Sequence, residues 1–305
     1  MNNQVKLAII SIIISIPLLS FIVLSSDAKQ FEQTNESKLQ VISSFYPLHE
    51  FSQNIGKEKI DAILLVPIGV EPHDWEPTIK NVQQIQKSDL IIINGIGFEN
   101  WIDKLNEMNY QGVIVDTSNG IIKKNIDEDS SVIGEHDRSG DPHIWLNPVF
   151  AKIQVKNIAN ALSDLDPENR NYFQDNAANY INELDLLDSK IRNELSGCNH
   201  DFLAFHDAFS YFADEYDLIQ HTVISSYEPH AETKAKTLES VINKAKQLNL
   251  KIIFTEETVD PKSSQIIANE IGGKILILSP LEIANDGTYI SKMTENLNYL
   301  KEALC

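Results

Sequence analysis

Short runs rich in Ile, Leu, Val and Phe alternate along the chain with longer stretches whose apolar residues recur at helical spacing. The short runs predict strands at 39–44, 59–66, 89–93, 113–116, 201–206, 219–224, 251–255 and 274–278. Several are almost continuously apolar, which is typical of parallel strands buried on both faces. The stretches between them predict helices at 46–56, 78–87, 98–108, 148–164, 208–216, 231–248 and 261–271. This alternation predicts an α/β fold with open, mostly parallel sheets flanked by helices.

One long amphipathic stretch, 166–197, separates two such sets of elements. It begins with Asp166, a favourable N-cap, and Pro167, which suits the first helical position. Its apolar residues recur at gaps of four and three, at Phe173, Ala177, Tyr180, Leu184, Leu187, Ile191 and Leu195. About thirty residues at ~1.5 Å each give a helix of roughly 45 Å. We therefore expect a rigid spine that joins two lobes, 39–165 and 198–305.

The N-terminal region predicts export. An apolar run from Leu7 to Leu24 follows Lys6, and small residues come next, which is typical of a signal peptide at 1–28. The run is also long enough for an uncleaved N-terminal anchor. Residues 29–38 are polar and lack periodicity, so we expect a flexible tether. The protein would then act in the periplasm or at the outer cell surface.

The composition narrows the classes of partner. With 25 Lys and Arg against 44 Asp and Glu, the formal net charge is −19 for 305 residues. That balance argues against binding to nucleic acid or to anionic lipid surfaces, and it suits attraction of cations. Gly and Pro are few, which excludes fibrous and low-complexity classes.

The chain has two cysteines, Cys198 and Cys305. In an oxidising environment outside the cytoplasm, such a pair often forms one disulfide. This bond would link the C-terminal helix to the start of a strand near 201. Two free thiols are also compatible with the sequence, so both alternatives stay open at this point.

Three histidines occupy distinctive settings, each close to a strand-like run. His73 lies in Gly-Val-Glu-Pro-His-Asp-Trp-Glu-Pro, His143 in Asp-Pro-His-Ile-Trp-Leu-Asn-Pro and His206 in Phe-Leu-Ala-Phe-His-Asp-Ala-Phe. Ligands in open α/β sheets bind beyond the carboxyl ends of the strands, so the three side chains can meet in a cleft between the lobes. Neutral imidazole is a favoured ligand of zinc and its neighbours in the transition series. We therefore predict a divalent-metal site.

These settings, with Ser-Phe-Tyr-Pro-Leu at 44–48, resemble those of the zinc and manganese solute-binding proteins of ATP-binding-cassette (ABC) importers, cluster A-I. The resemblance covers roughly residues 39–304. It implies that His73, His143 and His206 are metal ligands and that two lobes are joined by the spine helix. It also implies a monomeric, non-enzymatic protein that captures a divalent cation and delivers it to a membrane permease.

The fourth ligand position departs from the family pattern. The family usually has Leu-Asp-Pro-Leu at the end of the last strand, whereas this chain has Leu-Ser-Pro-Leu at 278–281. A neutral hydroxyl is a poorer ligand than a carboxylate, and its presence disfavours hard cations most. We therefore predict Zn²⁺ over Mn²⁺. The fourth position falls to Ser279, to a water, or to one of Glu71, Glu256 and Glu257.

Other polar and aromatic residues lie near the three histidines in sequence. Asp141 and Asp207 can each orient an imidazole or cap a helix. Trp75 and Trp145 can enclose the site or serve packing alone. The remaining histidines, His49, His136, His200, His221 and His230, are not predicted as ligands, although His136 lies in an acidic loop at 125–140 that resembles a reduced metal-capture loop.

The competing function is a zinc-dependent hydrolase. Three histidines plus an open position are also a catalytic layout, for which Glu71, Asp74 or Asp207 can act as general base. The chain has neither a His-Glu-x-x-His helix nor a nucleophile elbow, which favours the binding protein. A metal-binding adhesin or a receptor for a metal chelate is a third class with similar architecture.

Overall fold

Residues Lys38–Cys305 form one compact unit. The computed structural model describes residues 38–107, 109–121, 140–224, 235–257, 260–283 and 287–305. The predicted export segment lies outside these residues, as do His136, His230 and nearly all of the tether and the acidic loop. Within the described ranges, no helix has the length and apolar character that crossing a membrane requires.

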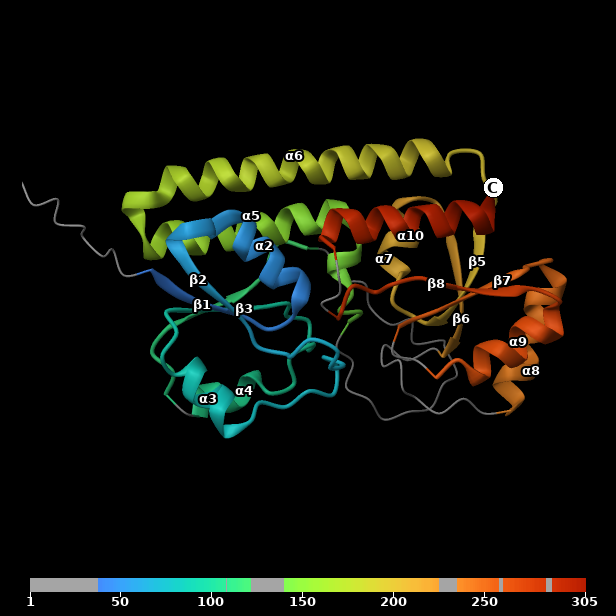
Figure 1. Cartoon of the computed structure of the whole chain (residues 1–305), viewed down its shortest axis with the longest axis horizontal. Helices are drawn as coiled ribbons and strands as arrows, with labels where there is room; N and C mark the ends of the chain where they lie inside the picture. Colours follow the sequence, from blue (N-terminus) through green and yellow to red (C-terminus); the bar gives the residue numbers. More distant parts are fainter. Residues whose placement is uncertain (1–37, 108, 122–139, 225–234, 258–259, 284–286) are drawn as a thin grey trace, which may run out of the picture. The chain divides into compact units, whose positions relative to one another are not determined.

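Two four-stranded parallel sheets form the framework (Figure 1). The first contains β1 (Leu39–Ser43), β2 (Ile60–Leu64), β3 (Leu90–Ile93) and β4 (Val113–Asp116), in the order β2-β1-β3-β4. The second contains β5 (Asp201–His206), β6 (Ile219–Ile224), β7 (Ile252–Thr255) and β8 (Lys274–Ile277), in the order β6-β5-β7-β8. Every adjacent pair is parallel. The predicted α/β fold with two open parallel sheets is confirmed.

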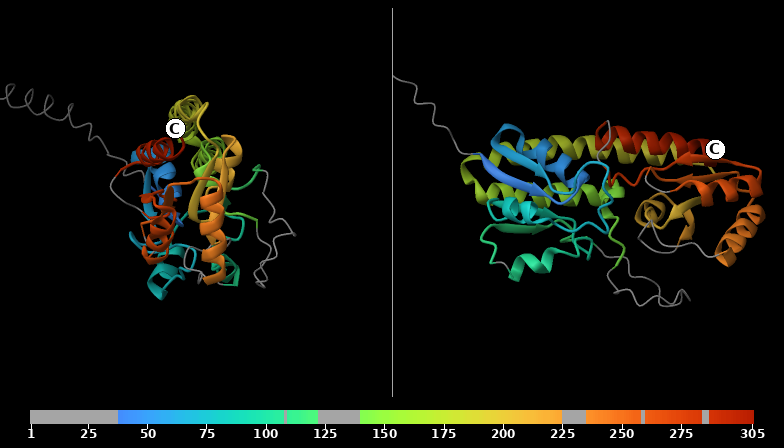
Figure 2. Two further views of the ribbon diagram at one scale, coloured as in Figure 1. Left: turned by 90° about the vertical axis from the view of Figure 1, so that its right-hand side faces the viewer. Right: turned by 60° about the horizontal axis from the view of Figure 1, so that its bottom comes forward.

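Helices connect the strands because parallel neighbours need a crossover. Around the first sheet these are α2 (Tyr46–Gly56), α3 (Ile79–Ile85), α4 (Ile102–Glu107) and α5 (Pro148–Leu165), with the 3₁₀ turns η1 (Lys57–Lys59) and η2 (Ile144–Leu146). Around the second they are α7 (Ser210–Glu215), α8 (Ala235–Gln247), α9 (Lys262–Ile271) and α10 (Tyr289–Leu304). Helices α5, α6 and α10 gather on one side of the sheets, and α3, α4, α8 and α9 lie on the other (Figures 1 and 2).

The predicted spine is α6 (Arg170–Leu195), preceded by the 3₁₀ turn η3 (Pro167–Asn169). The Asp166 carboxylate accepts the backbone N–H of Asn169 at 3.2 Å, as expected of a residue that starts a helix. The apolar stripe of α6 is buried from Phe173 to Leu195. It packs into a single core that also takes in residues of both sheets, such as Val41 and Phe202. The long helix therefore joins the two halves through continuous packing (Figure 1).

A disulfide closes the C-terminal end of the chain. Cys198, just after α6, is bonded to Cys305, the last residue, across a separation of 107 positions. Next to the bridge, the backbone N–H of Asn199 donates to the carbonyl of Leu304 at 2.9 Å. The predicted disulfide is confirmed.

Candidate metal centre

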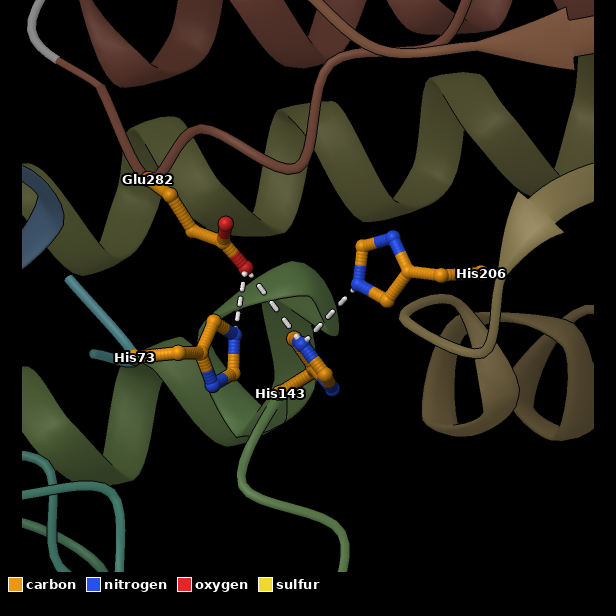
Figure 3. A group of neighbouring side chains, drawn as sticks. All are labelled: His73, His143, His206 and Glu282. Carbon is orange, nitrogen blue, oxygen red and sulfur yellow. Dashed lines mark hydrogen bonds and ion pairs between the residues drawn. The ribbon is translucent and has the colours of Figure 1, made fainter. Parts of the chain in front are cut away.

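Four buried side chains from four separate segments converge on one point (Figure 3). His73 follows β2, His143 precedes η2, His206 is the last residue of β5 and Glu282 follows β8. Each offers one ligand atom, and these atoms all lie within 4.8 Å of one another. Their residues are 8%, 0%, 0% and 3% exposed, in chain order. The structure thus brings the three predicted histidines together and adds a carboxylate.

Parallel strand topology explains how residues far apart in sequence meet. His206 stands at the carboxyl end of β5, and Glu282 and His73 come from the loops that leave β8 and β2. The segment that carries His143 is held against the first sheet by a hydrogen bond. The side-chain amide of Asn94, just after β3, donates to the carbonyl of Pro142 at 2.8 Å.

Glu282 is the residue that sequence reasoning missed. Its Oε1 lies 3.1 Å from Nε2 of His73 and 3.3 Å from Nε2 of His143. Burial raises the pKa of Glu282, but the two imidazoles more than offset it and hold that pKa below its usual range. The available signal was an acidic residue three positions after Ser279, in the loop that leaves the last strand.

Ser279, one of the candidates for the fourth position, forms local hydrogen bonds beside the turn that leads to Glu282. Its hydroxyl accepts the backbone N–H of Leu281 at 3.3 Å, and its own N–H donates to Asn296 at 2.9 Å. Leu281 has a φ of 58°, in the left-handed region, so the chain turns sharply immediately before Glu282. The hydroxyl therefore supports the turn, and the carboxylate that follows it reaches the histidines.

The three other carboxylates named as candidates also lie outside the four-residue cluster. Glu256 is hydrogen-bonded to Nδ1 of His206, on the side of the ring away from the cluster. Glu71 accepts the backbone N–H of His73 at 3.3 Å. Burial, followed by repulsion from Glu282, raises the pKa of Glu71 to about 9. Glu257 is exposed.

Carboxylates orient two of the rings through their second nitrogen. The Nδ1–H of His143 donates to Asp141 Oδ1 at 2.8 Å, and that of His206 donates to Glu256. Burial lowers the pKa of His143, but the bonds to Asp141 and Glu282 raise it overall to about 10. Asp207 instead accepts the hydroxyl of Ser210 at 2.7 Å, so of its two predicted roles the structure favours local helix support. The Nε2 atoms of His143 and His206 face the cluster, because their Nδ1 atoms are held by Asp141 and Glu256.

Aromatic rings cover part of the site. The Trp145 ring lies 5.1 Å from that of His143, and the Phe98 ring lies 4.8 Å from that of His73. Trp75 packs instead against Trp101, at 5.9 Å between ring centroids. For these two tryptophans the sequence predicted either enclosure of the histidines or packing alone; Trp145 lies beside His143, whereas Trp75 packs against a neighbouring core.

Other described histidines serve local contacts outside the cluster. His221 Nε2 lies 2.7 Å from Asp201 Oδ1, and His200 Nδ1 contacts the carbonyl of Asp217. His49 is partly buried on α2, and burial lowers its pKa.

Comparisons with known proteins point to one family. The family profile described as zinc-uptake complex component A, periplasmic (ZnuA), matches residues 41–303. The chain is 36% identical over 294 residues to the high-affinity zinc uptake system protein ZnuA of Bacillus subtilis (strain 168), and the match covers 92% of each chain. It is 32% identical over 299 residues to the zinc-binding lipoprotein AdcA of Streptococcus pneumoniae serotype 4. That match spans 92% of this chain but only 58% of AdcA.

Comparison of the fold with solved structures finds the same family of proteins. The crystal structure of the Zn(II)-bound ZnuA-like domain of Streptococcus pneumoniae AdcA is similar, with a TM-score of 0.75 and 30% sequence identity. The match covers 87% of this chain and 98% of that one. Sequence and fold agree over both sheets and the long helix, and the chain belongs to the ZnuA family of zinc-uptake components.

Proposed function

We propose that the protein captures Zn²⁺ outside the cytoplasm and delivers it to the permease of an ABC importer. His73, His143, His206 and Glu282 are the proposed ligands. The observation that carries this proposal is the convergence of four buried ligand atoms within 4.8 Å of one another. The histidine assignments rest on sequence context as well as on this geometry, and Glu282 rests on the geometry alone.

The spacing of the ligand atoms suits a tetrahedral ion. A tetrahedron with bonds of ~2.1 Å, typical of zinc with nitrogen and oxygen ligands, has edges of about 3.4 Å. Nε2 of His143 lies 3.4 Å from Nε2 of His206 and 3.3 Å from Glu282 Oε1. His73 Nε2 lies 3.1 Å from the same oxygen. Three imidazoles with one carboxylate favour zinc over manganese, which prefers oxygen ligands.

The relatives support zinc as cargo and transport as the role. The names of the Bacillus and Streptococcus proteins specify zinc uptake or zinc binding. For this chain we infer an exported protein, held at its N-terminus or released by a signal peptidase, that acts as a monomer and meets a membrane permease. The segment that decides between anchor and cleaved signal, residues 1–28, lies outside the described residues.

The proposed role includes no catalysed reaction. Structural and binding zinc sites are closed by four protein ligands, whereas catalytic sites keep a position open for water. Here a carboxylate completes the set of four. Of the candidate bases, Glu71 accepts the N–H of His73, Asp207 accepts the hydroxyl of Ser210, and Asp74 is exposed. This arrangement supports binding over hydrolysis.

A competition titration with a chelating dye tests the proposal. The wild-type protein should take one Zn²⁺ from the dye. His206→Ala should lower the affinity by at least about 100-fold, because it removes one of four ligands, while the unfolding temperature of the metal-free protein changes little. His221→Ala, which removes a histidine paired with Asp201 away from the cluster, is the matched control and should bind as wild type. Equal affinities for wild type and His206→Ala would refute the proposal.

A further inference from the structure

Trp145 touches both a proposed ligand and the segment that bears another. Its ring lies 5.1 Å from the ring of His143, two positions earlier in the chain. Its indole N–H donates to the carbonyl of Pro280 at 2.7 Å, two positions before Glu282. The side chain is fully buried, so this hydrogen bond has no water to replace it.

Two further hydrogen bonds, both made by Tyr289, hold the chain downstream of Glu282 next to Trp145. The hydroxyl of Tyr289 donates to the carbonyl of Trp145 at 2.6 Å. The backbone N–H of Tyr289 donates to Glu50 Oε2 on α2 at 2.6 Å. Trp145 is therefore hydrogen-bonded to the chain on both sides of Glu282, to Pro280 upstream and to Tyr289 downstream.

The turn before Glu282 is held on one side by Ser279, whose hydroxyl accepts the N–H of Leu281, and on the other by the bond from Trp145. Leu281 adopts the left-handed conformation, which costs a non-glycine residue free energy and persists where the surroundings hold it. The indole bond to Pro280 acts on the residue directly before this turn. Without that bond, the buried carbonyl of Pro280 loses its partner, and the turn loses a contact that fixes its position.

We propose that Trp145 is a positioning residue that fixes Glu282 against His143, so that two of the four ligands are held in place before the metal arrives. This inference rests on the proposed zinc site. It assigns to the tryptophan a role beyond packing, carried by the indole N–H, and predicts that its effect on zinc passes through Glu282.

A double-mutant cycle on zinc affinity tests this coupling. Trp145→Phe keeps an aromatic ring beside Phe45 and Phe98 but removes the N–H donor. It should weaken zinc binding roughly 10- to 100-fold, the usual effect of losing a group that orients a ligand. In a Glu282→Ala background, the same substitution should change the affinity less than about twofold, because the group it positions is gone.

Three further measurements separate positioning from general damage. Trp101→Phe, at a buried tryptophan in a different core, should bind zinc as wild type. Tyr289→Phe, which removes the hydroxyl that holds the Trp145 carbonyl, should show the same dependence on Glu282. The visible spectrum of the Co²⁺-loaded Trp145→Phe protein should shift towards that of Co²⁺-loaded Glu282→Ala.

The possible outcomes are distinct. An equal loss of affinity in both backgrounds, for Trp145→Phe and for Tyr289→Phe, would overturn the inference while leaving the zinc site intact. An unchanged affinity for both single variants would overturn it as well. Failure of the wild-type protein to bind zinc in the same titration would instead remove the proposed function on which the inference depends.

Discussion

At the scale of single residues, the candidate site depends on which nitrogen of each imidazole is available. The Nδ1 atoms of His143 and His206 are engaged by Asp141 and Glu256. These bonds fix the rings and turn Nε2 of each towards the cluster. Because Asp141 is two positions from its histidine whereas Glu256 is fifty positions from His206, one partner was predictable from sequence and the other was not.

Removing the carboxylate that orients His206 should weaken zinc binding. Glu256→Gln should lower the affinity roughly 10- to 100-fold, because an amide holds the imidazole less firmly and makes it a weaker donor to the metal. Glu257→Gln, at the exposed neighbouring position, is the control and should have no effect. The same dye competition measures both variants, and identical affinities for the two would contradict the assigned role of Glu256.

At the scale of the elements, the loops after the strands hold the site in place. The loop after β3 is organised around Glu99, which is buried. Its Oε1 accepts the hydroxyl of Ser44 at 2.7 Å and the N–H of Asn94 at 2.8 Å, and its Oε2 accepts the N–H of Gly95 at 3.1 Å. Burial raises the pKa of Glu99 to about 7, although these hydrogen bonds act in the opposite direction.

Glu99 should make the stability of the metal-free protein depend on pH. Between its unfolded pKa of 4.5 and its folded pKa of about 7, the folded state binds the extra proton. Its contribution to stability is therefore fully present below pH 4.5 and is lost as the pH rises through 7. At 1.36 kcal/mol per unit of pKa, the full change is about 3 kcal/mol.

Urea unfolding of wild type and Glu99→Gln across this window measures the effect. The difference in unfolding free energy between the two proteins should shift by about 3 kcal/mol in favour of the variant as the pH rises, since a neutral amide does not titrate. Parallel profiles would show that Glu99 titrates in its ordinary range. The comparison cancels the contributions of the other carboxylates, which both proteins share.

At the scale of the whole Lys38–Cys305 unit, α6 and the disulfide link the two sheets and the end of the chain. The core is continuous along α6, and the Cys198–Cys305 bridge closes a loop of 107 positions that contains the whole second sheet. Neither cysteine belongs to the cluster of ligand residues. The bridge therefore contributes to stability rather than to the coordination of metal.

Replacing both cysteines with serine should lower the free energy of unfolding by about 2–5 kcal/mol, because the unfolded chain regains the freedom that the bridge removes. Under conditions where the variant remains folded, its zinc affinity should equal that of wild type. Chemical denaturation and the dye competition, run on the same preparations, check the two parts. A loss of affinity in the folded variant would show that the bridge also shapes the site.

The fold could be predicted almost completely from the sequence, because its elements have strong local signals. Each predicted strand is found within two residues at either end, since buried parallel strands are nearly continuous apolar runs. His73, His143 and His206 were identified from their settings at the ends of strands. Their meeting point was an expectation from topology, and the structure places them together.

The fourth side chain of the cluster could not be predicted, for a physical reason. A left-handed turn at Leu281 comes directly before Glu282, the residue that joins the histidine cluster. That conformation is unusual for leucine and has no local sequence signal. The contacts around this turn include tertiary ones, such as the bond from the Trp145 indole to the carbonyl of Pro280, which only the folded molecule supplies.

The proposed coordination can be examined by anomalous diffraction from crystals of the zinc-loaded protein, recorded above and below the zinc absorption edge. We expect one strong zinc peak per chain, ~2.0–2.2 Å from Nε2 of His73, His143 and His206 and from a carboxylate oxygen of Glu282. A zinc peak elsewhere, or one that contacts only some of the histidines while the others point away, would refute the proposed site.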